Sequence, residues 1–413
     1  MPWKEIGAVD ERIAFVREVL RDQTSKSELC RQYGISRPTG DKWVQRYQEH
    51  GQDGLADLPS APHYHPNQVS EELAEMLLDM RRKHMTWGPK KLKAYGERRD
   101  SRRKWPWPST IGQLLKRHGL AVGRAWRHRT PAYTQPFAGC GEPNRTWCGD
   151  FKGQFYTGDG SVCYPLTLTD AFSRYLLRCQ GMPGPCTAPT QSIFEAAFRE
   201  YGLPQAIRTD NGAPFASKAV GGLSRLSVWW LKLGIVPERI QPGHPEQNGR
   251  HERMHLTLKK ETASPPGRSP RAQQQRFDAF REEYNQQRPH EALDQRTPAE
   301  VYEASPRPYP SRLPEPEYGD LATIRAVRHN GEIKWQGARM YLGQVLAGES
   351  VGMEPISEGY WLVYFYKMPV GVLDDRRRKV WNVAMAIRKG WLTTDALPSP
   401  FRCAPGTGQS VEV

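Results

Sequence analysis

The hydrophobic pattern of this chain changes period at about residue 147, and this change constrains the fold more than any other feature. Before it, apolar residues recur every three or four positions, as they do in amphipathic helices. After it, short apolar runs over residues 147–156, 162–169 and 174–180 are separated by turn sequences and predict three adjacent strands. Helices and single strands then alternate. This order predicts a mixed sheet covered by helices and preceded by all-α units.

The chain has 413 residues, enough for several domains, and stretches rich in proline and glycine mark their boundaries. The predicted fold class is multidomain, with N-terminal all-α helix-turn-helix units, a central α/β core with a mixed sheet, and a C-terminal small β-barrel. The expected segments are a helix-turn-helix unit (1–58), a second, winged-type helix-turn-helix unit (68–130), a linker (131–146), the core (147–304), the barrel (315–375) and a basic tail (376–413).

The first helical unit contains the turn and cap residues of a helix-turn-helix. Gly34 is expected in the turn, Ser36 at the helix N-cap and Pro38 in the first helical turn, where a missing N–H costs nothing. Val44 and Tyr47 are expected to face the core. An ordinary helical bundle is the alternative. The side chains expected to project toward a DNA groove are Arg37, Thr39, Lys42 and Arg46.

Positive charge is concentrated in one segment of the chain. Residues 81–130 have a net charge of +14, whereas residues 1–80 have −5 and residues 131–413 have +5. Such concentration on a folded segment predicts nucleic-acid binding. A solvated basic face without a partner is the alternative. The side chains of the second unit expected to contact DNA are Lys90, Lys91, Lys93, Thr110, Gln113, Lys116 and Arg117.

Composition excludes several classes of protein. No apolar run approaches the roughly 18 residues of a transmembrane helix. Residues 1–20 alternate charged with apolar side chains, unlike a signal peptide, so no membrane partner and a cytoplasmic location are expected. The seven cysteines include no C-x-x-C pair, which argues against a disulfide framework and against a cysteine zinc site.

Three acidic residues lie where phosphodiester chemistry needs them. Asp150 is on the first predicted strand, Asp210 ends the fourth, and Glu252 is in the first turns of a helix. Two neighbouring strand ends and a helix bring three carboxylates to one point, where their charges repel unless cations neutralise them. A pair of Mg²⁺ ions about 3.5–4 Å apart does so and activates a nucleophile. Each residue taken alone is better explained as a turn former or a surface charge, so the prediction depends on the three together.

Taken in order, these motifs resemble those of insertion-sequence transposases with a retroviral-integrase-type core. The resemblance covers both helix-turn-helix units and the β domain. It implies a ribonuclease H-like core with DDE chemistry, in which the three carboxylates are catalytic and bind two Mg²⁺ ions, with Mn²⁺ as a substitute. The matching pieces are Trp147 to Asp150, Thr209-Asp210-Asn211-Gly212, Pro245 to Glu252 with Asn248-Gly249, Lys259, and Asn285 to Leu293.

The resemblance also implies a function. Such a transposase binds the terminal inverted repeats of its element, hydrolyses a phosphodiester and transfers the freed 3′-hydroxyl into target DNA. Because two ends are joined to one target, a homo-oligomer on double-stranded DNA is implied, in the bacterial cytoplasm with the nucleoid. Asn211 and Gly212 are expected to shape the turn that directs Asp210 inward. Contacts with substrate phosphates are implied for Arg250, His255 and Lys259.

The spacing of the acids leaves two candidates for the third position. The familiar motif has 35 residues between its second and third acids, which selects Glu246, whereas 41 residues lie between Asp210 and Glu252. Glu252 stands three residues after Gly249 and inside the helix, as the motif requires. Glu246 precedes that glycine in a loop. We therefore assign Glu252.

Two other functions compete with this interpretation. His251-Glu252-Arg253-Met254-His255 has the H-E-x-x-H pattern of zinc proteases, with two histidines on one helix face. A protease would leave Asp150, Asp210 and the DNA-binding segments unexplained. The second alternative is a catalytically inert DNA-binding repressor on the same scaffold.

Overall fold

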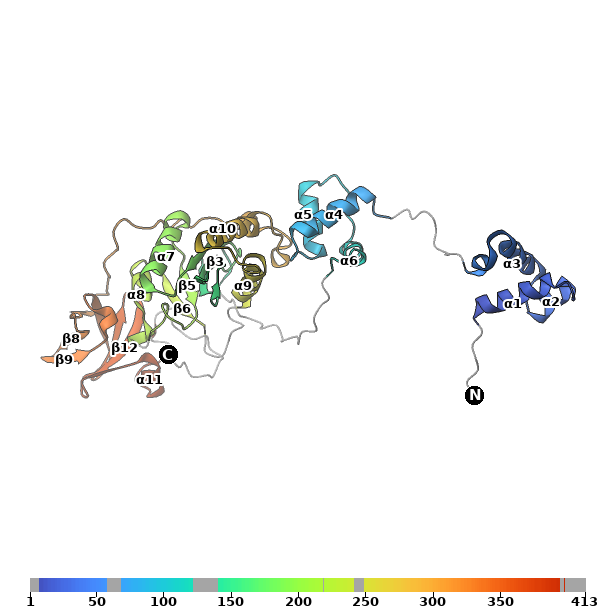
Figure 1. The fold of residues 1–413 in the computed structure, drawn as a ribbon. Coiled ribbons are helices and arrows are strands. Elements are labelled where there is room, and N and C mark those ends of the chain that lie inside the picture. The colour runs from blue at the N-terminus through green and yellow to red at the C-terminus, as the bar shows by residue number, and fades with distance from the viewer. Residues whose placement is uncertain are drawn as a thin grey trace. The chain divides into compact units, whose positions relative to one another are not determined.

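The computed structural model describes residues 7–57, 68–121, 140–217, 219–240, 249–393 and 397, except for the side chain of Arg250. The chain divides into two compact units, Met1–Ser70 and Glu71–Val413 (Figure 1). Glu246, most of the expected linker and the end of the expected tail lie outside the described residues.

The first unit is a three-helix bundle. Ser25 and Ser36 cap the second and third helices, and Gly34 has the positive φ of 62° that the intervening turn needs. Gly40 lets these two helices approach closely, because a Cβ there would lie 2.7 Å from Cys30 Sγ. The predicted helix-turn-helix is confirmed, with Val44 buried and Tyr47 packed against the core. Its helices are α1 (Ala8–Leu20), α2 (Lys26–Gln32) and α3 (Arg37–His50), followed by a 3₁₀ turn (Gly51–Leu55).

A second three-helix bundle opens the larger unit. Trp87, Leu92 and Ile111 are buried at its centre, and Trp105 packs where Gly96 has no side chain. The described part, residues 68–121, contains three helices and no strand, and residues 122–130 of the expected winged unit lie outside the described residues. The helices are α4 (Glu71–Lys83), α5 (Pro89–Arg99) and α6 (Pro108–Arg117).

The central sheet is mixed, as predicted. Its main order is β4-β3-β1-β5-β6, with β2 pairing beside β3. Strands β4, β3 and β1 pair antiparallel, and a short turn joins β3 to β4. Strands β1, β5 and β6 pair parallel, because helices make the crossovers between them. The strands are β1 (Thr146–Phe151), β2 (Phe155–Tyr156), β3 (Val162–Asp170), β4 (Leu176–Met182), β5 (Ala206–Thr209) and β6 (Val236–Arg239).

Two helical layers cover this sheet, each with its own hydrophobic core (Figure 1). Trp147, Phe194 and Trp230 join the sheet to α7 (Thr187–Tyr201) and α8 (Arg225–Lys232). On the other face Leu176, Met254 and Phe277 join it to α9 (Gly249–Thr262) and α10 (Pro270–Gln286). Strand β3 alternates between these faces. Leu166 and Leu168 belong to the first core, and Thr167 and Thr169 face α9.

The C-terminal part is an open β structure, so the predicted barrel is not confirmed. Within the described residues, one five-stranded antiparallel sheet has the order β13-β12-β11-β10-β7, and β8 and β9 form a separate hairpin. Strands β7 and β13 are edges, because they have no pairing with each other. A strand and a helix also occupy part of the expected tail. The elements are β7 (Thr323–Ala326), β8 (Glu332–Trp335), β9 (Ala338–Tyr341), β10 (Ser350–Ser357), β11 (Tyr360–Phe365), β12 (Met368–Asp374), β13 (Lys379–Trp381) and α11 (Val383–Arg388).

Candidate active site

Asp150 and Asp210 lie at the ends of neighbouring parallel strands. The register of β1 and β5 pairs Gly149 with Thr209, and each aspartate is the next residue in its chain direction. Residues that follow a registered pair in parallel strands lie side by side at the same edge of the sheet. The sheet topology therefore brings these two predicted acids together from positions sixty residues apart.

The turn after β5 holds Asp210 in place. The backbone N–H of Gly212 donates to Asp210 Oδ1 at 3.2 Å, and Asn211 Nδ2 donates to the carbonyl of Ile240 at 2.9 Å, which ties the turn to the end of β6. Burial raises the pKa of Asp210, and the Gly212 hydrogen bond opposes that rise. A cation beside this carboxylate would relieve the cost of burying its charge.

Two histidines fasten α9 to the sheet next to Asp150. The Nε2 atoms of His251 and His255 both lie 2.6 Å from the hydroxyl of Thr167, and Nδ1 of His251 lies 3.0 Å from the hydroxyl of Thr169. Both rings are only 2% exposed. Burial lowers the pKa of His251 to about 3 and the pKa of His255 well below its usual value, so both rings are neutral near pH 7.

Asp150 completes this cluster. Its Oδ2 lies 3.7 Å from Nδ1 of His255, and its carbonyl accepts a 3.2 Å hydrogen bond from Thr167. Among the described residues, Asp150, His251 and His255 form the one group of three metal-ligating side chains whose ligand atoms lie within 4.8 Å of one another. Asp210 and Glu252 are not members. The structure thus joins Asp150 to two histidines more closely than to the other two acids.

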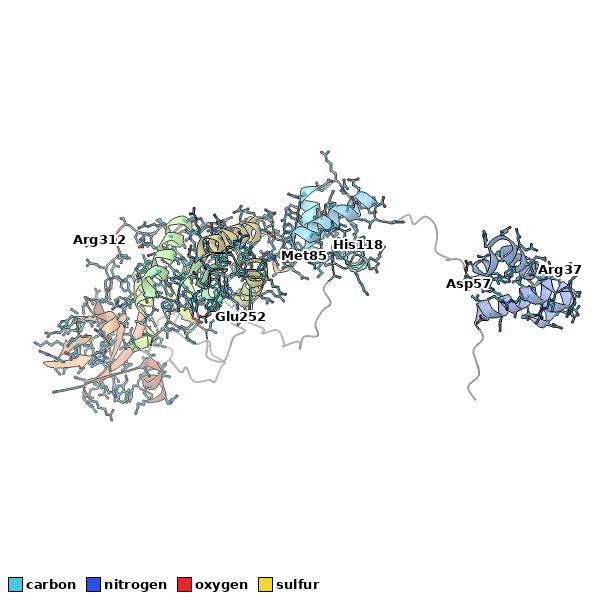
Figure 2. The ribbon with its side chains drawn as sticks, in the orientation of Figure 1. Arg37, Asp57, Met85, His118, Glu252 and Arg312 are labelled. Carbon is cyan, nitrogen blue, oxygen red and sulfur yellow. The ribbon has the colours of Figure 1, made fainter. Side chains whose placement is uncertain are left out.

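Glu252 occupies the first turn of α9, beside His251 and three residues before His255, and its side chain is exposed (Figure 2). Lys259 is exposed farther along the same helix. His255, for which a phosphate contact was expected, has its ring buried against Thr167 and Asp150. The side chain of Arg250 lies outside the described residues.

Thr167 and Thr169 were not predicted as site residues. Two sequence signals could have identified them. The two threonines alternate with Leu166 and Leu168 on one strand, and the two histidines are spaced i, i+4 on the later helix. Only the packing of α9 on β3 shows that these two pairs meet.

Asp170, the last residue of β3, serves a structural purpose. It is buried, and its carboxylate accepts hydrogen bonds from the backbone N–H of Asn144 (2.8 Å) and from the N–H and hydroxyl of Ser173 (both 2.7 Å). Burial raises the pKa of Asp170, which these hydrogen bonds oppose. This carboxylate holds the β3–β4 turn.

The predicted DNA-binding side chains of α3 differ in exposure. Arg37, labelled in Figure 2, and Lys42 are exposed. Thr39 is half-buried with its hydroxyl 2.8 Å from that of Ser36, and Arg46 is half-buried with its guanidinium 5.2 Å from the centre of the Trp43 ring. Arg37 and Lys42 are therefore the more accessible of the four.

The lysines predicted to form a basic face on α5 have partners within the chain. Lys90 forms an ion pair with Glu291 and Lys93 with Glu97. Lys91 is half-buried, and desolvation, reinforced by the nearby charge of Arg288, lowers its pKa to about 7. On α5, Lys90 is exposed beside its ion-pair partner. On α6, Thr110 is half-buried, and Gln113, Lys116 and Arg117 are exposed.

None of the helices in the described residues is long and apolar enough to cross a membrane.

Five family models match consecutive parts of the chain. Residues 141–245 and residues 233–298 each match an integrase core domain. Residues 11–63 match a helix-turn-helix domain and residues 39–115 a homeodomain-like domain. Residues 322–381 match the C-terminal domain of the IS481 family transposase.

Two insertion-element proteins are similar to this chain over most of their own length. An uncharacterized 31.7 kDa protein of insertion element IS407 from Burkholderia multivorans is 28% identical over 237 residues, 57% of this chain and 82% of the relative. An uncharacterized 39.2 kDa protein of insertion element IS476 from Xanthomonas euvesicatoria is 27% identical over 304 residues, 72% of this chain and 78% of the relative. The chain is therefore similar to insertion-sequence transposases with an integrase core.

Solved structures similar to this chain include retroviral integrases. The match to the HTLV-2 integrase catalytic core domain in complex with magnesium covers 39% of this chain and 98% of that domain, with 18% identity and a TM-score of 0.32. The match to the simian T-cell lymphotropic virus intasome in complex with PP2A regulatory subunit B56 gamma covers 70% of this chain and 91% of the matched chain, with 16% identity and a TM-score of 0.36.

Proposed function

We propose that this chain is a transposase that hydrolyses phosphodiester bonds at the ends of its element and transfers the freed 3′-hydroxyls into target DNA. The observation that carries the proposal is the β1–β5 register, which sets Asp150 beside Asp210 while the two histidines hold the Glu252 helix against Asp150. This is the arrangement that the integrase core family leads us to expect, with the third acid supplied by a helix.

The donor set fits a divalent cation. Carboxylate oxygens from two strand ends and one helix are the ligands that Mg²⁺ and Mn²⁺ prefer, and the raised pKa of Asp210 shows that its carboxylate is costly to ionise without a nearby positive charge. We infer that Asp150, Asp210 and Glu252 hold two Mg²⁺ ions, for which Mn²⁺ substitutes. When bound, such a pair neutralises the charge that develops on the attacking and leaving oxygens.

The chain's own residues position the substrate and the carboxylates. Asn211 and Gly212 fix the turn that carries Asp210, and Thr167 fixes the histidines beside Asp150. Lys259 is exposed seven residues after Glu252, two turns along α9, so we assign it a contact with a phosphate of the bound strand.

The helix-turn-helix units bind DNA in this proposal. Exposed side chains of α3 and α6 contact the terminal inverted repeats, with base edges giving specificity and phosphates giving affinity. Because both ends of the element are joined to one target, the active form is a homo-oligomer of two or more chains. Because the relatives come from bacteria, we infer that the reaction takes place in the cytoplasm, on the nucleoid.

Strand cleavage and end binding, measured separately, test the proposal. A labelled duplex carrying the element's end is incubated with the wild-type chain, with Asp150→Asn, and with Asp320→Asn, an exposed control outside the site. We expect the wild type and the control to nick the duplex in Mg²⁺, and Asp150→Asn to bind it equally while losing at least about 100-fold in rate.

Two outcomes would contradict the proposal. A wild-type chain that binds ends but never nicks them in Mg²⁺ or Mn²⁺ behaves as the inert repressor. Stoichiometric Zn²⁺ together with a peptidase activity lost in His251→Ala identifies the zinc-protease alternative.

A further inference from the structure

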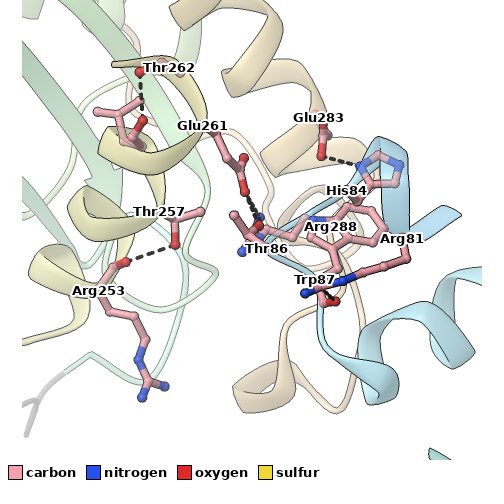
Figure 3. Close-up of polar contacts among 11 residues, drawn as sticks. Arg81, His84, Thr86, Trp87, Arg253, Thr257, Glu261, Thr262, Glu283 and Arg288 are labelled. Carbon is pink, nitrogen blue, oxygen red and sulfur yellow. Dashed lines mark hydrogen bonds and ion pairs between the residues drawn. The ribbon is translucent and has the colours of Figure 1, made fainter. Parts of the chain in front are cut away.

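The second three-helix bundle, formed by α4, α5 and α6, is docked against the catalytic core through the loop between α4 and α5. Figure 3 shows this loop, with His84, Thr86 and Trp87, facing α9 and α10. The hydroxyl of Thr86 contacts Glu261 near the end of α9. Arg288, just after α10, donates to Glu261 Oε1 at 2.8 Å and to the Thr86 hydroxyl at 3.2 Å. One buried guanidinium thus joins the unit to the catalytic helix.

A second polar contact lies beside the first. Nδ1 of His84 is 2.8 Å from Glu283 Oε1 on α10, and the His84 ring stacks on Trp87 at a centroid distance of 3.9 Å. Arg81, buried within the unit, donates to the carbonyl of Trp87 at 2.5 Å and to that of Leu120 at 3.1 Å. The loop is therefore held rigid from inside its own unit.

Helix α5 extends the contact along the core. Lys90 pairs with Glu291 at 2.5 Å. At the other end of α5, Arg98 donates to the carbonyl of Gln295 at 2.9 Å and lies 3.4 Å from Glu300. Contacts at two separated points along one helix fix its direction as well as its position.

The character of these contacts indicates a specific arrangement. The side chains of Arg288 and Glu261 are only 8% and 20% exposed. Burying such a pair has a desolvation cost that is repaid only in good geometry, and separating it leaves charges without partners. A sliding or transient contact between the unit and the core would not tolerate that loss.

Helix α9 connects this interface to the chemistry. Glu252 lies near its start and Glu261 near its end, nine residues or about 14 Å apart along a straight helix. On the other side of the interface, α6 is packed in the same small bundle as the docked loop, through Ile111 and Trp87 at its core. A rigid path therefore runs from the exposed face of α6 to the catalytic helix.

We propose that this docking contact sets the position of the cut. It holds the DNA bound by α6 at a fixed distance from the catalytic carboxylates, so the chain cuts at one phosphate relative to the sequence that it reads. The inference rests on the proposed function for its cutting step. Thr86, His84 and Arg288 are positioning residues in this scheme, because they touch neither DNA nor the reacting atoms.

The test uses neighbouring substitutions in the docking loop of the full-length chain. Thr86→Arg sets a second guanidinium against buried Arg288 and separates the surfaces. Met85→Arg adds the same charge one residue earlier, where the side chain is 52% exposed (Figure 2). Cleavage positions are mapped at single-nucleotide resolution on an end-labelled duplex. We expect Met85→Arg to cut where the wild type cuts, and Thr86→Arg to bind within about threefold but to cut at several positions.

A second pair of variants separates docking from DNA contact. Lys90→Glu weakens docking, and adding Glu291→Lys restores the ion pair with reversed sign. Recovery of a single cut position in the double variant supports docking. If Lys90 instead contacts a phosphate, the double variant cuts as diffusely as Lys90→Glu, and that result overturns the role of this pair.

Footprinting decides the inference independently of activity. Hydroxyl-radical footprints in Ca²⁺ report where the core lies relative to α6, without any cutting. We expect one core footprint at a constant offset in the wild type and in Met85→Arg, and a weakened or displaced one in Thr86→Arg. If Thr86→Arg, folded by its urea unfolding curve, has the wild-type offset, the proposal is wrong. A wild-type chain that never cuts refutes the proposed function and not the docking proposal. In that case the footprint offset still tests whether docking fixes the position of the core.

Discussion

Nδ1 of His255 lies 3.7 Å from Oδ2 of Asp150, while Nε2 of the same ring lies 2.6 Å from the hydroxyl of Thr167. One imidazole therefore spans from strand β3 to the carboxylate on strand β1, and it belongs to the helix that carries Glu252. The ring therefore links α9 both to β3 and to Asp150.

Replacing this ring should weaken both the fold and the chemistry. We expect His255→Ala to lower the free energy of unfolding by about 2–3 kcal/mol, because it leaves a cavity and removes one hydrogen bond of the Thr167 hydroxyl. We also expect it to reduce nicking at least about tenfold, because the helix loses its anchor beside Asp150. Urea unfolding and nicking rates check this. Thr257→Ala on the same helix is the control, and equal effects from both variants would contradict the anchoring role.

The buried histidines should make the fold sensitive to acid. The pKa of His251 is lowered to about 3 by burial, so below about pH 6.5 the unfolded chain binds a proton that the folded chain does not. Stability therefore falls as pH falls, by at most about 1.4 kcal/mol per pH unit for each such ring. Between pH 7.5 and pH 5, the unfolding free energy should depend less on pH for His251→Gln than for the wild type. Exposed His118→Gln should leave the slope unchanged.

Two aspartates at strand ends should respond in opposite ways to the same substitution. Asp170→Asn places an amide where three donors converge, so we expect a loss of about 2–3 kcal/mol in unfolding free energy. Asp210→Asn should leave stability within about 0.5 kcal/mol and reduce nicking at least about 100-fold. Unfolding and cleavage measured on both variants test this. A catalytically dead but fully stable Asp170→Asn protein would reverse the assignment.

Lys91 should destabilise the fold at neutral pH. Because desolvation lowers its pKa to about 7, the unfolded chain binds more protons between pH 7 and about 10, and stability rises with pH across that window. Lys91→Met should raise the unfolding free energy by roughly 1–2 kcal/mol at pH 7 and progressively less toward pH 10. Thermal melts over this range test the prediction, with exposed Lys104→Met as the control. A gain independent of pH would show that packing, and not charge, is responsible.

End binding should depend on α6 more than on the α5 lysines. Each of Lys116→Ala and Arg117→Ala should reduce the slope of log affinity against log salt by about 1, as expected for one lost phosphate contact. Lys93→Ala should change it less, because Glu97 already neutralises that charge. Fluorescence anisotropy on the element's end at several salt concentrations measures these slopes. A larger effect at Lys93 would restore α5 as the phosphate-binding helix.

Local patterns were sufficient to predict most secondary structure. The serine caps and turn glycine of the first helix-turn-helix, and the strands on both sides of Asp170, depend on residues close in the chain, so short windows contain the information. The open C-terminal sheet was predicted less well. Whether strands such as β7 and β13 meet to close a barrel depends on curvature and pairing over some fifty residues, which periodicity does not encode.

Net charge predicted a basic segment, but it did not predict which of the segment's side chains are free to contact DNA. Sixteen basic residues between positions 81 and 130 indicated DNA binding, yet Glu291 and Glu261, far along the chain, face two of the α5 lysines. The same holds for the candidate site. Asp150, Asp210 and Glu252 were identifiable from motif order, because each motif is local. The packing of α9 on β3 decides that the His255 ring points inward and contacts the Thr167 hydroxyl. Only folding brings these residues, 88 positions apart in the chain, within hydrogen-bond distance.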